Sequence, residues 1–549
     1  MNSQNVLLAD EWDTPGSLLL SMKAEKGVNL EDFLSQHNES RKFFPKLLYY
    51  LLATFSGLNI KHVIYARYLL LLLCSFMLYR ISRKKKSSNK SILISGFMLS
   101  ALIAHPSQAL SHLTSIQVIT IVPPFFIILF FYLKNDESPY KDISLYLLSC
   151  IISTFSFANG MLLWVLLFPS LFIGRNLSSK TKIIFSAITV LTFGACMCLY
   201  FIDYNSPGGH PSILDGLMKP VKSFRYFILW LGTPFAHSHV SASIVGSIIG
   251  FVSFAVFCLN VVLLFKRNRS FLKLSSVLLS SPWAILVFYA LISGALASLG
   301  RSGFGVLQAL SPQYPSMAIW FYIGIWGMFF SQSDGSDFAV NRFPKYALVV
   351  VCLLAYPSGI FEMNKWNQRF KEGVLTMKLN SLIPHNPLFK WNGEYGLYPG
   401  DQATSHPVRS QFDELLAAGL IDFETYDNKL LAKNLNDTAD SPDGGCLSYV
   451  SHQTHTEFWG WASISKQGKP ADFIIIVEDT NSTFIPVTGL LLNEEKKDIS
   501  HHFQKFEFGD IWGFKKKIYE PTFYAKKFRA FAIDEKTLQA YPLTLLNYE

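Results

Sequence analysis

The stretch "KHVIYARYLLLLLCSFMLYRISRKKKSSNK", residues 61–90, carries the two signals that decide the fold of this chain. Residues 61–80 are almost wholly apolar and are long enough to cross a bilayer as a helix. Residues 80–90 add a cluster of lysines and arginines, and such clusters stay on the cytoplasmic side of a membrane. We therefore predict an integral membrane protein in which residues 80–90 face the cytoplasm.

The composition of the chain agrees with this prediction and indicates three parts. Of the 549 residues, 50% are hydrophobic and only 16% are charged, whereas a soluble domain has about 25% charged residues. The apolar character ends near residue 361. We predict an acidic loop with an interfacial helix in residues 1–60, a transmembrane core in residues 61–361 and a soluble domain in residues 362–549. The net charge of +9 lies largely in short loops and does not indicate a nucleic-acid partner.

Further apolar runs give the number of membrane crossings. Residues 143–173 are continuously apolar, but Asn159-Gly160 is a turn signal in their middle, so two short helices that enter and return are expected there. Together with the other runs they predict about ten transmembrane helices. Those other runs are residues 61–80, 91–105, 116–133, 183–202, 241–265, 277–298, 315–330 and 346–361.

The basic loops orient these helices. Counting crossings from residues 80–90 places three further basic segments on the cytoplasmic side: residues 174–182, 266–273 and 341–345. By the same count, the outer face carries residues 1–60, 203–240 and 299–314 and all residues after 361.

Two N-terminal features need separate explanations. A crossing at residues 42–58 would reverse every loop, so we expect this apolar, basic-flanked segment to lie in the outer interface. No signal peptide or helix precedes Asp10, and we expect the natural start to lie upstream with one more helix. Unaided translocation of a short polar N-terminus is the alternative.

The soluble part begins with a helical pattern and continues as strands. Residues 408–434 have the helical pattern. Short apolar runs separated by turn residues then predict strands, and together a small β-sandwich. The runs are residues 446–452, 456–464, 472–479, 511–520 and 528–534.

The loops on the predicted outer face combine carboxylates with cations. The segment "ADEWDTPG" supplies Asp10, Glu11 and Asp13. A carboxylate there could take a proton from a sugar hydroxyl, and cations could hold a lipid-linked phosphate as it leaves. The candidates for binding are His37, Asn38, Glu39, Arg41, His210, Lys219, Lys222, Arg225, Tyr226, Arg301, Gln313 and Tyr314.

Each of these residues also has a structural interpretation. Acidic residues near a chain start are often simply solvated, and the lysines and arginines of these loops can anchor helices among lipid headgroups. His452 and His455 could form a metal pair, but we find no array of carboxylates or cysteines around them at ligand spacing. We therefore predict no metal ligands; no cofactor is indicated, although a divalent metal would be compatible with the loops.

The order of the motifs resembles bacterial membrane glycosyltransferases of the GT-C superfamily, especially those that decorate O-antigen with glucose. The segments "ADEWDTPG" and "QHNESRKFFPKLL" are similar to the family's first periplasmic loop, with its Asp-rich knot and His-Asn-Glu-His-Arg stretch. "SFANGMLLW" (156–164) is similar to its Asn-Gly hairpin, and "GRSGFGVLQALSPQYPS" (300–316) to its Gly-Arg…Ser-Arg-Tyr segment. "EFWGWASI" and "GDIWGFKKKIYEP" resemble its β-rich periplasmic domain.

The resemblance implies roles for individual residues. Asp10 would be the catalytic base, with Glu11 or Asp13 as its partner. His37, Asn38, Glu39 and Arg41 would line the same cavity, and Arg301 and Tyr314 would face the donor phosphate. The chain departs from the family pattern at Glu11, where a second Asp is usual, at Ser40, which stands for His, and at Gln313, which stands for Arg.

The implied activity is transfer of a sugar from a polyprenyl-phosphate donor to a periplasmic glycan such as O-antigen. The enzyme, inverting or retaining, would reside in the bacterial inner membrane with its C-terminal domain in the periplasm. It would depend on an enzyme that makes the donor and on a flippase that moves the donor across the membrane. The alternatives are a flippase or transporter of lipid-linked saccharides and an O-antigen polymerase or ligase. Transporters usually need ionisable residues inside their spans, and we find essentially no Asp, Glu or Lys there.

Overall fold

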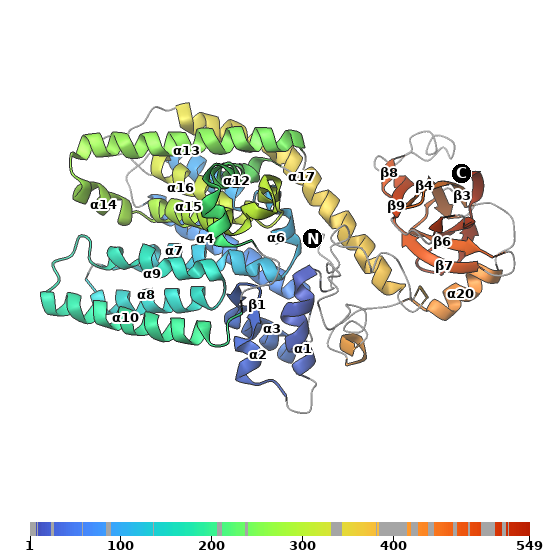
Figure 1. The fold of residues 1–549 in the computed structure, drawn as a ribbon, viewed down its shortest axis with the longest axis horizontal. Helices are drawn as coiled ribbons and strands as arrows, with labels where there is room; N and C mark the ends of the chain where they lie inside the picture. Colours follow the sequence, from blue (N-terminus) through green and yellow to red (C-terminus); the bar gives the residue numbers. More distant parts are fainter. Residues whose placement is uncertain are drawn as a thin grey trace. The chain divides into compact units, whose positions relative to one another are not determined.

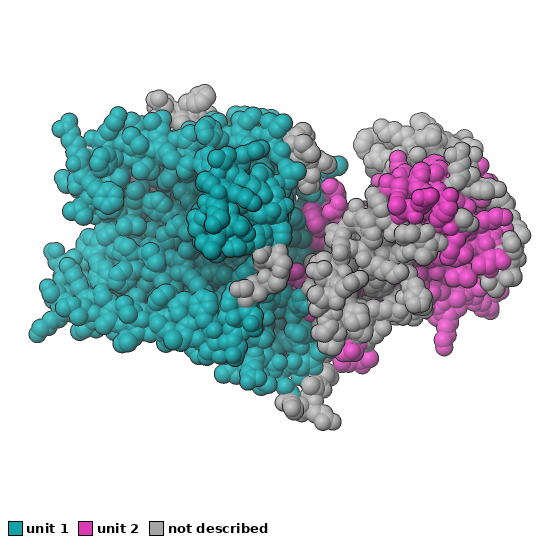
Figure 2. Space-filling view, in the orientation of Figure 1, with its two compact units in different colours: residues 1, 13–364 teal, residues 2–12, 365–549 magenta. Residues whose placement is uncertain are grey.

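The structure, a computed structural model, contains two compact units: residues 13–364, and residues 365–549 together with residues 2–12 (Figure 2). Helices make up the first unit apart from one two-stranded hairpin, and strands with a few helices make up the second (Figure 1). The structure describes residues 7, 9–22, 27–56, 59–83, 89–135, 137–205, 211–236, 240–330, 343–379, 382–383, 414–418, 426–437, 444–464, 469–480, 484–495, 511–518, 523–524 and 526–548.

Among the described residues, seven helical segments are long and apolar enough to cross a membrane, which indicates a membrane protein. The sequence predicted about ten crossings. The three others, α8 (Pro139–Thr154), residues 158–171 and α16 (Pro315–Phe330), are helical but shorter than the roughly 20 residues that a span needs. The seven segments are Ile60–Arg83, Leu93–Leu113, Ile116–Leu133, Ser179–Phe201, Ser243–Lys266, Pro282–Phe304 and Ala347–Lys378.

The remaining helices of this unit connect, flank or extend these segments. Short helical turns alternate with them, and the predicted interfacial segment is α3. In chain order the α-helices are α1 (Ser17–Ser21), α2 (Leu30–Leu34), α3 (Phe43–Ser56), α4 (Ile60–Arg83), α5 (Asn89–Ile103), α6 (Ala109–Leu113), α7 (Val122–Leu133), α8, α9 (Leu162–Leu166), α10 (Ser179–Phe201), α11 (Ile213–Met218), α12 (Pro220–Gly232), α13 (Val240–Asn268), α14 (Phe271–Leu279), α15 (Pro282–Arg301), α16 and α17 (Phe343–Lys378).

The helix α16 lies at the centre of the first unit. It is apolar on all sides, and a helix of this kind must be buried in protein or lipid. Here it packs against α15, α5 and α12, and its residues from Pro315 to Met328 are almost all buried. By contrast, only 22% of the apolar window of α10 or α13 is buried, so these two helices present the faces that lipid would cover.

The predicted break at Asn159-Gly160 is present and joins two helical segments, as expected. The helix α8 ends at Thr154, and a short 3₁₀ turn (Ala158–Met161) leads into α9. A Cβ atom at Gly160 would collide with the backbone of Ser153, so only glycine allows the chain to fold back this closely. The helices α8, α9 and α10 run alongside one another (Figure 1).

The helices α12 and α13 approach each other through glycines. A Cβ atom at Gly232 would collide with the carbonyl oxygen of Gly246, and one at Gly250 would collide with the carbonyl oxygen of Ile228. Small residues allow such backbone contact between membrane helices. The two helices are therefore held together by their backbones at this end.

The last helix of the core extends further than the sequence indicated. The apolar run ends near residue 361, but α17 continues to Lys378, and its C-terminal part belongs to the second unit. Leu375 and Leu379 are buried there in an apolar cluster, so tertiary packing sustains the helix after its hydropathy falls.

The second unit contains two β-sheets packed face to face, in agreement with the predicted sandwich. One sheet has the strand order β11-β10-β6-β7, and the other has β12-β3-β4-β9-β8 with β5 paired to β4. All five predicted strand runs are strands, whereas β5, β7, β8, β11 and β12 were not predicted. The strands are β3 (Gly445–Ser451), β4 (Thr456–Ile464), β5 (Lys469–Pro470), β6 (Phe473–Asp479), β7 (Phe484–Leu490), β8 (Glu494–Glu495), β9 (Ile511–Ile518), β10 (Phe528–Ile533), β11 (Ala540–Pro542) and β12 (Thr544–Tyr548).

The position of β6 between two apolar clusters explains why its sequence is continuously apolar. Ile474 and Ile476 face the core between the sheets, whereas Phe473, Ile475 and Val477 face a second cluster that contains α20 (Asn428–Asp437) and the end of α17. Alternate residues of a strand point to opposite faces, so burial on both faces requires an unbroken apolar run. Of the predicted helical stretch 408–434, residues 408–413 and 419–425 lie outside the described residues.

A buried ion pair links the first turn of α8 to the segment that precedes α10. Arg175 and Asp142 form this pair, and their side chains are 2% and 0% exposed. Arg175 also donates to the carbonyl oxygen of Asn135 at 2.8 Å, and the backbone N–H of Asn135 donates to Asp142 at 3.1 Å. Through Asn135 the pair also holds the α7–α8 connection in place.

We predict that Arg175→Ala lowers the free energy of unfolding by about 3–5 kcal/mol, because it leaves the Asp142 carboxylate buried and unpaired. Thermal unfolding of the purified protein in detergent should show a clearly lower midpoint. Replacing both residues with leucine should recover most of the loss, since no uncompensated charge remains. Lys182→Ala, at an exposed position, serves as the control. A wild-type midpoint for Arg175→Ala would contradict this account.

Candidate functional site

A two-stranded hairpin presents the residues of the "QHNESR" motif. The strands β1 (Gln36–His37) and β2 (Ser40–Arg41) pair with Gln36 opposite Arg41 and His37 opposite Ser40. Asn38 lies in the turn with a φ of 50°, a conformation that asparagine tolerates better than most residues. The hairpin buries His37 and leaves Glu39 partly exposed beside Asn38 at the tip.

Arg41 holds this hairpin in place. Its guanidinium donates to the carbonyl oxygen of Tyr200 at 2.6 Å and also to the carbonyl oxygens of Leu34 and Ile202. The side chain is buried, and its donors point to backbone acceptors at the ends of α2 and α10. This geometry favours a positioning role for Arg41.

The opposite side of the hairpin is held by two further elements. The Tyr200 hydroxyl donates to the carbonyl oxygen of Glu39 at 2.8 Å. The backbone N–H of Ala158, in the "SFANG" motif, donates to Ser40 Oγ at 3.2 Å. Ser40, which stands where the resembled family has histidine, thus joins the first loop to the break between α8 and α9.

Glu39 forms an ion pair with Arg301, the last residue of α15. The two residues are 262 positions apart in the sequence, and both remain accessible, with side chains 39% and 26% exposed. The structure therefore brings together a carboxylate of the first loop and a guanidinium of the loop near residue 300. Tyr204 lies close by, and burial first and Glu39 second raise the pKa of its phenol.

A buried polar cluster lies next to Arg301. Tyr226 of α12 donates to Gln308 Oε1, and its hydroxyl lies 3.2 Å from the hydroxyl of Tyr314. Burial and the neighbouring Tyr314 raise the pKa of Tyr226, and the charge of Arg301 opposes this shift. The cluster connects α12 to the segment between α15 and α16. The sequence analysis did not single out Gln308, because an isolated glutamine carries no motif signal.

Two more predicted residues lie in the same region. Lys222 Nζ lies 3.4 Å from the carbonyl oxygen of Gly303, and Ser223 Oγ lies 3.1 Å from Ser302 Oγ. Pro211 covers the space in which a Cβ of Gly303 would lie, whereas the corresponding space at Gly300 is open. Lys219, at the N-terminal end of α12, is exposed, Gln313 is partly buried, and His210 lies outside the described residues.

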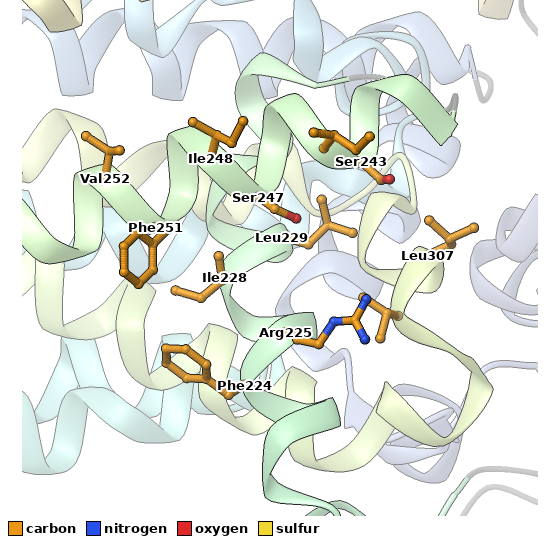
Figure 3. A pocket seen from close by; sticks show the side chains of 12 residues that line it. Phe224, Arg225, Ile228, Leu229, Ser243, Ser247, Ile248, Phe251, Val252 and Leu307 are labelled. Atoms are coloured by element: carbon orange, nitrogen blue, oxygen red, sulfur yellow. The ribbon is translucent and has the colours of Figure 1, made fainter.

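An apolar groove of about 650 Å³ borders this cluster, between α12 and α13. Arg225 extends from α12 toward the side of the groove where Leu307 lies (Figure 3). Arg225 is the charged residue of this lining, which otherwise consists of two serines and nine apolar residues. The groove is lined by Phe224, Arg225, Ile228, Leu229, Ser243, Ile244, Ser247, Ile248, Phe251, Val252, Val306 and Leu307.

The acidic segment is divided along the chain between the two units. Asp10 and Glu11 lie in a short helical turn (Ala9–Glu11) that belongs with the second unit, and Glu11 is buried. Asp13, the first residue of the first unit's main segment, is exposed. Asp10 remains a predicted base, and Glu39 and Arg301 form their ion pair within the first unit.

The sequence analysis did not single out the buried arginine of α4. Arg67 lies within the span α4 and is 1% exposed, and its Nη1 lies 3.0 Å from His112 Nδ1. Tyr68 stacks on His112 with the ring planes 5° apart. The signal was an arginine inside an apolar run, which the search for Asp, Glu and Lys in the spans did not include.

Comparisons with known proteins do not identify a family. No protein-family model matches the sequence, and no curated protein or solved structure is significantly similar to it. The functional argument therefore rests on the geometry of the site and on the sequence motifs.

We predict that Arg41→Lys and Arg301→Lys have different effects on stability. Lysine cannot reproduce three divergent guanidinium contacts, and each lost hydrogen bond from a charged donor costs about 1.5–3 kcal/mol. The Arg301 pair is partly exposed and contributes only about 0–1 kcal/mol. Thermal unfolding in detergent should therefore show a lower midpoint for Arg41→Lys and a nearly unchanged one for Arg301→Lys. Equal midpoints would argue against the positioning role of Arg41.

Proposed function

We propose that the chain is a GT-C-like glycosyltransferase of the bacterial inner membrane. It transfers a sugar, glucose in the group it resembles, from a polyprenyl-phosphate donor to a periplasmic glycan such as O-antigen. The observation that supports this proposal best is the pairing of Glu39 with Arg301 beside the buried cluster of Tyr226, Gln308 and Tyr314. Three loops that the sequence analysis assigned to one face converge here.

Arg301 is suited to bind the donor phosphate. Its guanidinium is partly exposed, and it offers planar paired donors that match phosphate oxygens. Glu39 orients the guanidinium before the donor arrives. As the sugar departs, the phosphate gains negative charge, so the contact with Arg301 becomes stronger in the transition state and accelerates the reaction.

The groove between α12 and α13 is suited to the lipid part of the donor. Its apolar lining matches an isoprenoid chain, and Arg225 supplies a cation for the attached phosphate. Arg225 precedes Tyr226 in α12, and Leu307 precedes Gln308, so the groove and the polar cluster share two structural elements. This arrangement supports a lipid-linked donor over a soluble nucleotide sugar.

The acceptor hydroxyl needs a base, and we assign this role to Asp10, with Glu11 or Asp13 as its partner. The assignment rests on the acidic segment and on its resemblance to the first loop of the GT-C enzymes. Glu39 is paired with Arg301 and is assigned to orientation of the guanidinium.

A flippase of lipid-linked saccharides is the second candidate. The observation that favours it is Arg67, because a buried cation inside a membrane span usually marks a pathway or a functional site. The two candidates differ in their products. Purified protein incubated with polyprenyl-phosphate glucose and an acceptor glycan should release polyprenyl phosphate if it is a transferase, whereas a flippase should only move the labelled lipid between the leaflets of a vesicle.

We predict that Asp10→Asn abolishes transfer while the protein still inserts into the membrane. The amide keeps the shape of the side chain but cannot accept a proton, and loss of a general base costs a factor of about 10²–10⁴. Release of polyprenyl phosphate by the purified variant measures this directly. Asp13→Asn is the matched comparison. Turnover near the wild-type rate in Asp10→Asn would remove the base role from Asp10 and direct attention to Glu11 or Asp13.

We also predict that Arg301→Lys lowers kcat clearly and that Arg301→Ala lowers it further, with expression unchanged. Lysine provides a charge but not the paired planar donors, so it should restore only part of the stabilisation of the leaving phosphate. Steady-state kinetics with varied donor concentration separate kcat from KM. If Arg301 only anchors α15 among headgroups, lysine will substitute fully and the Arg301→Lys enzyme will have wild-type rates.

A further inference from the structure

The turn between β3 and β4 brings together two imidazoles and a carboxylate. Ser451 pairs with Thr456 at the end of this hairpin, so residues 452–455 form the turn. The imidazole centroids of His452 and His455 are 4.5 Å apart, and His455 Nε2 lies 3.4 Å from Glu457 Oε1. One ligand atom from each of the three residues lies within 4.8 Å of the others.

The backbone fixes this arrangement. The N–H of His452 donates to the carbonyl oxygen of His455 at 2.7 Å, which closes the turn and sets both histidines on it. In β4 the neighbours Thr456 and Phe458 are buried in the sandwich, so the intervening Glu457 points to the outer face of the sheet. The two histidines therefore lie on a turn that this hydrogen bond closes, and Glu457 lies on the strand that follows the turn.

These three side chains have the chemistry of a transition-metal site. Two imidazoles and one carboxylate bind Zn²⁺ in many proteins, with bonds of about 2 Å, which places tetrahedral ligand atoms roughly 3.3 Å apart. Mg²⁺ and Ca²⁺ prefer all-oxygen ligands and fit poorly. Thr454 Oγ1 lies 3.0 Å from His455 Nδ1, and such a contact to the second ring nitrogen orients a metal-binding histidine.

We infer that His452, His455 and Glu457 form a binding site for a divalent transition metal, Zn²⁺ above all, on the β-sandwich of the second unit. The site is independent of the proposed transfer reaction. The sequence analysis left the two histidines without a role because it found no carboxylate or cysteine array near them. Glu457 completes a His-x-x-His-x-Glu set, and the reversal of the chain at the turn brings its carboxylate back toward both imidazoles.

Lys517 provides a test that separates a metal site from a surface ion pair. Its Nζ lies 3.4 Å from Glu457 Oε1 across the β4–β9 pair. A lysine at this distance competes with a metal for the carboxylate and repels it. If the three residues form only a surface ion pair, loss of Lys517 has no effect on metal affinity. If they bind a metal, Lys517→Met tightens binding by about 5-fold, as expected for one charge removed near the ion.

The experiment uses the full-length protein in detergent, purified without a histidine tag and stripped with EDTA. Titration with Zn²⁺ against a chromophoric chelator should show one tight site per chain, and Co²⁺ should give visible absorption typical of nitrogen ligands. His455→Ala and Glu457→Gln should each weaken binding by more than about 100-fold, and Thr454→Val by about 10- to 100-fold. Thermal midpoints of the metal-free variants verify that each one is folded.

A second histidine pair of the chain provides the control. His501 and His502 lie outside the described residues, and replacing both with alanine should leave Zn²⁺ affinity unchanged. Tight binding that persists in Glu457→Gln and His455→Ala, or that disappears only in the His501/His502 variant, would overturn the proposed site. Absence of any tight binding by the folded wild-type protein would overturn it as well.

Discussion

The candidate site depends on the hydrogen bonds that the guanidinium of Arg41 donates to backbone carbonyl oxygens. A short hairpin of two-residue strands has little stability of its own in water. Arg41 stabilises the hairpin by donating to carbonyl oxygens at the ends of two helices, where backbone acceptors have no partner within the helix. The position of Glu39, and through Glu39 the orientation of Arg301, follows from these contacts. One buried arginine therefore aligns groups that lie far apart in the sequence.

The sequence predicts those parts of the fold that depend on local composition. The apolar runs, the break at Asn159-Gly160 and the five strand runs are confirmed, because each is set by hydrophobicity over a few residues. Among the described residues, seven of the roughly ten expected crossings are helical segments long enough to span a membrane, and α16 shows that an apolar run can also form a helix buried in protein. The end of α17 was misplaced because contacts of Leu375 and Leu379, not hydropathy, sustain its last turns.

The candidate site was predictable in its members but not in their contacts. The motifs name Glu39, Arg41 and Arg301, and nothing in the sequence indicates that Arg41 faces backbone while Arg301 faces Glu39. That distinction depends on where helix ends lie in space. A residue without a motif, such as Gln308, becomes visible only when its buried partner is known. The role of Glu457 depends in the same way on the turn that returns β4 toward β3.

The glycine contacts between α12 and α13 have a consequence for mutational tolerance. Because the two backbones touch at Gly232 and Gly250, any side chain at these positions would force the helices apart. Residues along the groove, such as Ile248 and Val252, are not under this constraint and can exchange with other apolar residues. The spacing of the helices is thus fixed while the width and shape of the groove can vary. Substitution can therefore reshape the groove without disturbing the scaffold that holds it open.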